Sequence, residues 1–114
     1  MPTIDEVKTA VTGSKRRQFI LQSAANSTVA GGAVEINFDG EYIYAVRGTM
    51  NGAKPTLHIQ REGTSGFTTL TASEITVDGG SAIVQLTKGD DVYSQTTVVG
   101  GSTSYDAVLN PTTI

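Results

Sequence analysis

Short segments in which apolar and polar residues alternate are the feature that most constrains this fold. From residue 17 onward, β-favouring stretches of four to ten residues recur, and turn-forming residues separate them. Eight or nine short strands at this spacing are typical of an antiparallel sandwich or barrel. The predicted strand segments are Gln18–Ala25, Ala33–Phe38, Glu41–Met50, Thr56–Arg61, Phe67–Leu70, Glu74–Val77, Ala82–Thr87, Val92–Val99 and Tyr105–Leu109.

The turns between these segments follow from glycine and its polar neighbours. Asp39-Gly40 and Asn51-Gly52 suit tight hairpins, where a positive φ is tolerated. Gly89 permits a tight reversal, and the carboxylate of Asp90 can accept hydrogen bonds from the backbone amides of that turn.

Several segments have apolar side chains on both faces. Tyr44 alternates with Ile43 along one predicted strand, and Val84 alternates with Ile83 along another. A sandwich needs only one buried face per sheet. The second apolar face therefore predicts that it too is covered, as in a subunit interface.

Residues 1–16 form a predicted N-terminal helix or arm, and residues 17–114 form the predicted β domain. Thr3 and Glu6 have the capping-box spacing, and Gly13 stands where a helix would stop. A helix this short must dock on something to be stable, and the alternative is a frayed terminus. We expect its apolar face to contact a partner through Ile4, Val7 and Val11.

The composition excludes several kinds of chemistry. Cysteine is absent, so there is no disulfide framework or thiol nucleophile, and the one histidine cannot supply a His-rich metal site. The net charge of −3 argues against nucleic-acid binding. Charged residues make up only 17% of the chain, whereas threonine (17) and serine (9) are abundant, which favours a structural surface.

Neither a membrane span nor a signal peptide is predicted. No apolar run approaches the roughly 18 residues of a transmembrane helix, and the N-terminus lacks a basic start followed by an apolar core. We therefore expect the chain to be made and kept in the cytoplasm, or assembled there into something larger, with no membrane partner.

The remaining polar motifs predict neither an enzyme nor a cofactor site. His58 lies mid-strand, and no serine sits in a nucleophile elbow, so a catalytic triad is not indicated. Asp90 and Asp91 lack EF-hand spacing and favour turn chemistry over calcium binding. The basic run 14–17 favours a solvated turn over a phosphate contact.

Three motifs follow one another in order between residues 34 and 109: Phe38-Asp39-Gly40-Glu41-Tyr42-Ile43-Tyr44-Ala45-Val46, Leu57-His58-Ile59-Gln60-Arg61-Glu62-Gly63 and Ala82-Ile83-Val84-Gln85-Leu86-Thr87-Lys88-Gly89-Asp90-Asp91-Val92-Tyr93. In this order and spacing they resemble the trimeric jelly rolls of the complement-q-head and tumour-necrosis-factor-like superfamily. The final segment, 105–109, sits where that family has its last inward strand. The family's usual aromatic-rich C-terminal stretch is reduced here, and the chain begins with its own helix signal instead of a collagen-like or membrane stalk.

The resemblance implies an antiparallel jelly-roll β-sandwich of about eight strands that forms a homotrimer. Tyrosines that pack along the threefold axis are a further implication, and the alternative role of the same side chains is to stack on sugars. The residues expected at the trimer interface are Tyr42, Tyr44, Tyr93 and Tyr105.

The sequence also suggests a function. A short chain without cysteine, with a surface of threonine, serine and glycine, is similar to small virion proteins of tailed bacteriophages. We expect a non-enzymatic decoration (cement) protein on the capsid surface, bound to the lattice of the major capsid protein. The alternative is a tail-fibre or adhesin head that binds glycans.

Overall fold

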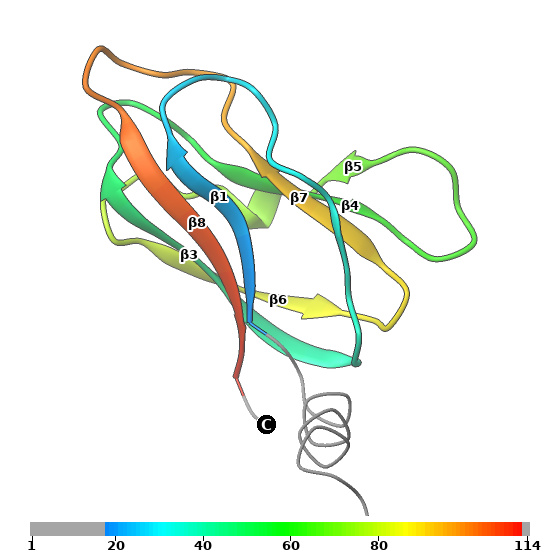
Figure 1. The fold of residues 1–114 in the computed structure, drawn as a ribbon. Helices are drawn as coiled ribbons and strands as arrows, with labels where there is room; N and C mark the ends of the chain where they lie inside the picture. The colour runs from blue at the N-terminus through cyan, green and yellow to red at the C-terminus, as the bar shows by residue number, and fades with distance from the viewer. Residues whose placement is uncertain (1–17, 113–114) are drawn as a thin grey trace, which may run out of the picture.

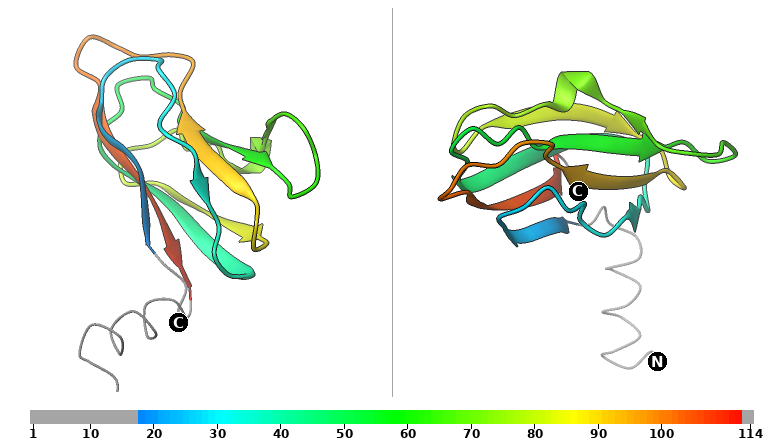
Figure 2. Two further views of the ribbon diagram at one scale, coloured as in Figure 1. Left: turned by 45° about the vertical axis from the view of Figure 1, so that its right-hand side comes forward. Right: turned by 90° about the horizontal axis from the view of Figure 1, so that it is seen from above.

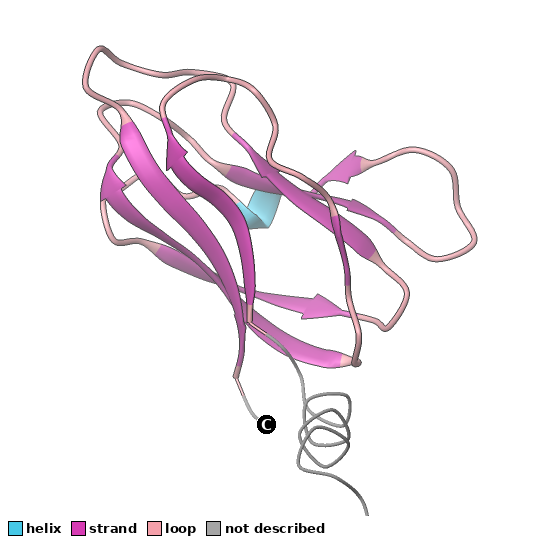
Figure 3. Ribbon diagram, viewed as in Figure 1, coloured by secondary structure: helices cyan, strands magenta, loops and turns pink. Residues whose placement is uncertain are grey.

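A computed structural model describes residues 18–112 of the chain (Figure 1). These residues form two antiparallel four-stranded sheets packed face to face, as the sequence predicts. A single turn of 3-10 helix, η1, lies between β5 and β6 (Figure 3). The elements are β1 (Phe19–Ala25), β2 (Val34–Glu35), β3 (Gly40–Thr49), β4 (Thr56–Gln60), β5 (Thr68–Thr69), η1 (Thr71–Ser73), β6 (Ser81–Leu86), β7 (Asp91–Gln95) and β8 (Ser104–Pro111).

The strand order is that of a jelly roll. One sheet has the order β1-β8-β3-β6 and the other has β2-β7-β4-β5. The first strand therefore pairs with the eighth, the second with the seventh, the third with the sixth and the fourth with the fifth, as if one long hairpin were rolled up. Successive strands alternate between the layers except at the β4–β5 hairpin, and Figure 2 shows the two layers from the side and from above.

The core lies between the sheets and is filled by the inward-facing residue of each alternating pair. On β3, Tyr42, Tyr44 and Val46 point inward, and none of them retains exposed surface. Tyr105 on β8 is 1% exposed, so three of the four tyrosines of the chain are core residues. Tyr42, Tyr44 and Val46 pack in one cluster with Leu21, Ile36, Met50, Ala53, Leu57, Ile59, Ile75, Leu86, Val92, Tyr105, Ala107 and Leu109.

The strand predicted at Glu74–Val77 does not form. Residues 74–77 form no strand, because the chain there is shaped by the preceding η1 turn. The hydroxyl of Ser73 accepts a hydrogen bond from the backbone N–H of Leu57 (2.9 Å), and the N–H of Ile75 bonds to the carbonyl of Pro55 (3.0 Å). These bonds hold Ile75 so that its side chain is buried in the core, although the segment pairs with no strand.

The turns form where expected, but two of them do not make hairpins. At Asn51-Gly52 both φ angles are positive, and the N–H of Ala53 bonds to the carbonyl of Met50 (2.9 Å). This turn, like Asp39-Gly40, connects strands that lie in different sheets. The hairpin prediction was wrong because local turn chemistry does not determine which sheet the next strand joins.

Candidate functional site

The candidate functional surfaces lie on the outside of the sandwich, because its interior is packed with side chains. Within residues 18–112, no group of three or more histidine, cysteine, aspartate or glutamate side chains is arranged to hold a metal ion. The surfaces that stand out are the outer face of each sheet and one cleft at their edge.

The outer face of the β1-β8-β3-β6 sheet carries apolar side chains on all four strands. Ile20 on β1 is 68% exposed, and Ile83 on β6 is 66% exposed. Large aliphatic side chains are mostly buried in globular domains, and a contiguous group of exposed ones marks an interaction surface. Between them lie side chains with less exposed surface on β3 and β8. We call the set of Ile20, Ile43, Ala45, Ile83 and Val108 the apolar face.

Strand register brings the apolar face together. Val108 is the pairing partner of both Ile20 and Ala45, and Ile43 is the partner of Ile83. Polar pairs border the patch: Arg47 lies opposite Asp106 at one end, and the amide of Gln85 contacts the carboxylate of Glu41 (3.4 Å) at the other. A patch of aliphatic residues inside a polar border is the usual form of a protein–protein contact. The prediction that apolar residues occupy a second face is confirmed for Ile43 and Ile83.

Three of the four tyrosines predicted at a trimer interface lie inside the monomer. Tyr42, Tyr44 and Tyr105 are at most 1% exposed, so they have no surface to offer a second chain. Their assignment to an interface was wrong, because alternation alone does not say which face of a strand turns inward. Tyr93 is different: its side chain lies on the outer face of the other sheet and is half-buried.

Tyr93 is part of an aromatic cluster on the outer face of the β2-β7-β4-β5 sheet. Its ring stacks on that of its cross-strand partner His58, with centroids 4.7 Å apart and planes 10° from parallel. Phe67 contacts the Tyr93 ring edge-on at 4.9 Å and is 41% exposed. We call His58, Phe67 and Tyr93 the aromatic cluster. Such pairs contribute about 0.5–1.5 kcal/mol beyond their buried area.

The surroundings of His58 favour its neutral form. Burial against Tyr93 lowers the pKa of the imidazole below its usual value, and its Nδ1 lies 3.1 Å from the hydroxyl of Thr69. The side chain therefore packs and hydrogen-bonds on the sheet surface.

Asp90 forms the turn that the sequence predicts. One oxygen of its buried carboxylate accepts hydrogen bonds from the Arg61 guanidinium (2.6 Å) and the Thr87 amide (2.9 Å). The other oxygen accepts a longer bond from the Glu62 amide (3.4 Å). All three partners are donors of the chain itself, so the carboxylate is engaged in holding the β6–β7 turn.

A cleft of about 360 Å³ lies beside β6, an edge strand of its sheet. Ile83, Val84 and Gln85 on β6 line one part of it, and the segment that contains η1 lines another, together with Arg61. Its lining mixes aliphatic and hydroxyl side chains. The remaining lining residues are Thr69, Leu70, Thr71, Ala72 and Ser73.

Comparison with known proteins assigns no family. No protein-family model matches the sequence, and no curated protein is significantly similar to it. In residues 18–112 there is also no helix with the length and apolar character needed to cross a membrane.

The remaining sequence predictions divide into untested and missed features. Ile4, Val7 and Val11 of the N-terminal arm lie outside the described residues. The aromatic cluster was not predicted as a unit, because Phe67 reaches Tyr93 across β4, and that contact depends on the β4–β5 hairpin. Cross-strand pairing of His58 with Tyr93 becomes predictable once the sheet order is known.

Proposed function

We propose that this protein is a non-enzymatic virion component, a decoration protein that binds the capsid of a tailed bacteriophage and stabilises it. The observation that carries the proposal is the apolar face, with Ile20 and Ile83 about two-thirds exposed at opposite edges of one sheet. Contact with a protein lattice would bury these side chains. Because few of its residues are charged, the sandwich suits a role in which binding depends on shape and contact area.

Binding of this kind stabilises a capsid by mass action. A protein that binds the assembled lattice but not its separated subunits lowers the free energy of the assembled state by an amount that grows with occupancy. Several copies joined together bind more tightly than one, without any new kind of contact. In this proposal the N-terminal arm adds contact through Ile4, Val7 and Val11. Virion localisation and the major capsid protein as partner belong to the same proposal.

The test is co-sedimentation of the purified protein with bare capsids of the phage whose genome encodes it. We expect the protein to pellet with capsids and to raise their disruption temperature. Ile20→Lys should weaken binding about tenfold or more, since it places a charge in the contact. Val77→Lys is the matched control, because Val77 is 63% exposed but lies in the loop before β6 and is not part of the apolar face. Absence of co-sedimentation, or equal binding by the two variants, contradicts the proposal.

Deletion of residues 1–13 tests the arm separately. We expect the truncated protein to keep its β-sheet circular dichroism spectrum and to bind capsids more weakly. Unchanged capsid affinity would remove the arm from the proposal without affecting the role of the apolar face.

The aromatic cluster favours a second candidate function, glycan binding. Phe67 presents an exposed ring to which the C–H face of a sugar could pack, and the polar side chains of Gln60 and Gln95 flank the cluster on the same face. Glycan-array binding that is lost in Phe67→Ala and kept in Val98→Ala would support it. Val98 is the control because it is 49% exposed and outside the cluster. No binding on the array would leave this second candidate without support.

A further inference from the structure

The four sheet edges of this sandwich are not equally protected. β2 and β5 are two residues long, which is too short to add a strand. β1 has two register irregularities, and its own loop covers it: a Cβ added at Gly31 would lie 2.1 Å from the Leu21 carbonyl oxygen. β6 pairs with β3 over six consecutive residues in unbroken register, and the segment 81–86 contains neither a charged residue nor a proline. Among the described strands, β6 is the long edge without the usual protection.

The hydrogen-bond pattern identifies which backbone groups of β6 are free. The Val46 N–H bonds to the Gly80 carbonyl, so the even-numbered residues that follow in β6 bond to β3. Ser81, Ile83 and Gln85 therefore turn their N–H and C=O groups away from β3. No residue between 18 and 112 forms a hydrogen bond with these groups. An open row of this kind is a template for another strand.

We propose that β6 pairs antiparallel with β6 of a second copy of this chain, across a twofold axis at Ile83. In this register, side chains of similar polarity lie opposite each other across the two β6 strands. Ile83 meets Ile83 of the second copy on the outer face, and Ser81 meets Gln85 of the second copy. On the inner side Ala82 meets Val84 of the second copy, a small residue against a larger one. Each contact occurs twice, as in any isologous interface.

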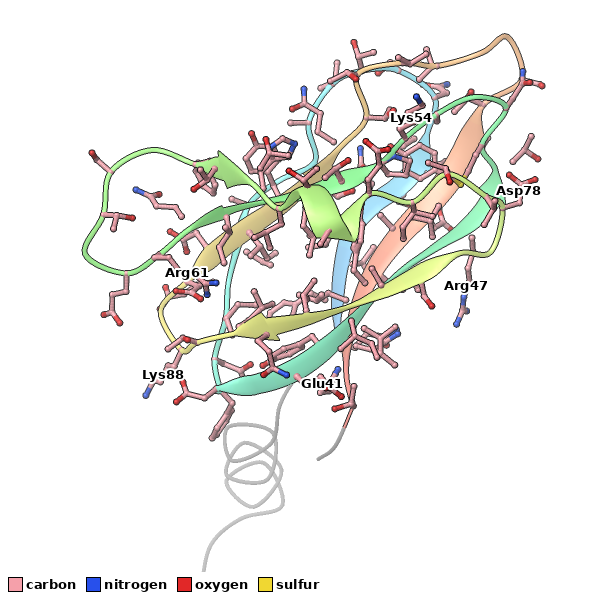
Figure 4. All side chains as sticks on the ribbon, turned by 180° about the vertical axis from the view of Figure 1, so that it is seen from behind. Glu41, Arg47, Lys54, Arg61, Asp78 and Lys88 are labelled. Atoms are coloured by element: carbon pink, nitrogen blue, oxygen red, sulfur yellow. The ribbon has the colours of Figure 1, made fainter. Side chains whose placement is uncertain are left out.

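The charges at the two ends of β6 select this orientation. Asp78 precedes the strand and Lys88 follows it, and Figure 4 shows them near its opposite ends. Antiparallel pairing centred on Ile83 brings the turn that contains Lys88 near the turn that contains Asp78 of the second copy, twice per dimer. One oxygen of the Asp78 carboxylate accepts a hydrogen bond from the Met50 amide (2.9 Å), and the other is available to Lys88. Parallel pairing would place like charges together. Opposite charges across an interface favour one register and disfavour the other.

The cleft beside β6 leaves room for the added strand. Its 360 Å³ volume lies against Ile83, Val84 and Gln85, so inward-facing residues of the incoming strand would enter it. Leu70 and Ala72 supply an apolar wall for the Val84 side chain of the second copy. The result is a continuous eight-stranded sheet, and the two apolar faces then lie side by side. This pairing does not depend on the capsid proposal.

Light scattering after gel filtration is the first test. We expect the native protein to have twice the mass of the chain. Ile83→Lys should raise the dissociation constant of the dimer at least about tenfold, because the lysines face each other at the axis. Ile20→Lys, a matched change on the opposite edge of the same sheet, should leave the dimer intact. Unchanged circular dichroism would show that both variants fold. A monomeric native protein, or the threefold mass implied by the family resemblance, overturns the proposal.

Cysteine cross-linking tests the register directly, because the chain contains no cysteine. A short thiol-specific cross-linker should join Ile83→Cys chains into a dimer, since the two positions are about 5.5 Å apart between Cα atoms in such a pair. Gln85→Cys is the control: its two copies would be four residues apart along the strand, about 14 Å. Equal cross-linking at both positions overturns this register. Lys88→Glu should weaken the dimer several-fold, and no change in its affinity overturns the antiparallel charge match.

Discussion

The hydroxyl groups of Tyr44 on β3 and Ser94 on β7 are hydrogen-bonded to each other across the sandwich. Ser94 donates its own hydrogen to the side-chain oxygen of Gln22 on β1 (2.7 Å), so Tyr44 must be the donor in the shared bond. Tyr105 on β8 donates to the same Gln22 oxygen (3.0 Å). One polar network in the core therefore connects four strands from both sheets.

Tyr44→Phe should destabilise the protein without affecting its association state. The change removes one buried hydrogen bond, which contributes about 1 kcal/mol, so the melting temperature should fall by about 4–8 °C. Tyr93→Phe is the matched control on the outer face and should lower stability by less than about 0.5 kcal/mol. Equal melting temperatures for the two variants would contradict the role of Tyr44 in the network.

Stability should decline in alkaline solution because of the buried tyrosines. Burial raises the pKa of Tyr44 and of Tyr105 above the ordinary value of about 10. A folded-state pKa above the unfolded one gives stability that is complete below about pH 10 and is lost as pH rises further, since only the unfolded chain ionises readily. Urea unfolding between about pH 8 and pH 11 measures this.

The control for the alkaline effect is a protein with both phenols removed. Tyr44→Phe combined with Tyr105→Phe should be less stable at neutral pH but should lose less stability between pH 8 and pH 11. An equally steep loss in the double variant would assign the pH dependence to other groups.

Much of the fold could be predicted from the sequence because the strands are amphipathic and glycine marks their ends. The alternation of Tyr42, Tyr44 and Val46 predicts β3, and the Gly89-Asp90 turn predicts the β6–β7 connection. The segment 74–77 misleads, since its β-favouring residues are fixed by backbone bonds to Pro55 and to η1. Local preference is weaker than tertiary context there.

The candidate surfaces were less predictable than the fold. Apolar residues on both faces of β3 and β6 correctly indicate an exposed apolar face at Ile43 and Ile83. The same pattern cannot tell which face is the core, so the buried tyrosines were placed at an interface. The free edge of β6 follows from sheet order, which is a property of the whole chain.

Asp90→Ala should cost about 2–4 kcal/mol of stability. The change removes the acceptor for the Arg61 guanidinium and for the amides of Thr87 and Glu62. Asp91→Ala, at the half-buried neighbouring position, should change stability by less than about 0.5 kcal/mol. Urea denaturation of both variants provides the comparison.

Arg61→Ala separates the contribution of charge from that of the turn. The guanidinium is half exposed, so its loss should cost only about 1 kcal/mol while Asp90 keeps its backbone donors. If Arg61→Ala lowers the free energy of unfolding as much as Asp90→Ala does, the ion pair, and not the bonds from the Thr87 and Glu62 amides to Asp90, stabilises the β6–β7 connection.

Gly48→Ala should be the most damaging of three glycine substitutions. Gly48 lies in β3 with φ of 124°, and a Cβ there would be 2.4 Å from the Ser104 carbonyl oxygen, so strain and a backbone clash add to about 2–4 kcal/mol. Gly52 has φ of 91° but open space around it, and its replacement by alanine should cost about 1 kcal/mol. Gly32→Ala meets neither obstacle and should be neutral or stabilising by up to about 1 kcal/mol. Melting temperatures that do not follow this order would contradict the close β3–β8 approach, on which the position of the apolar face depends.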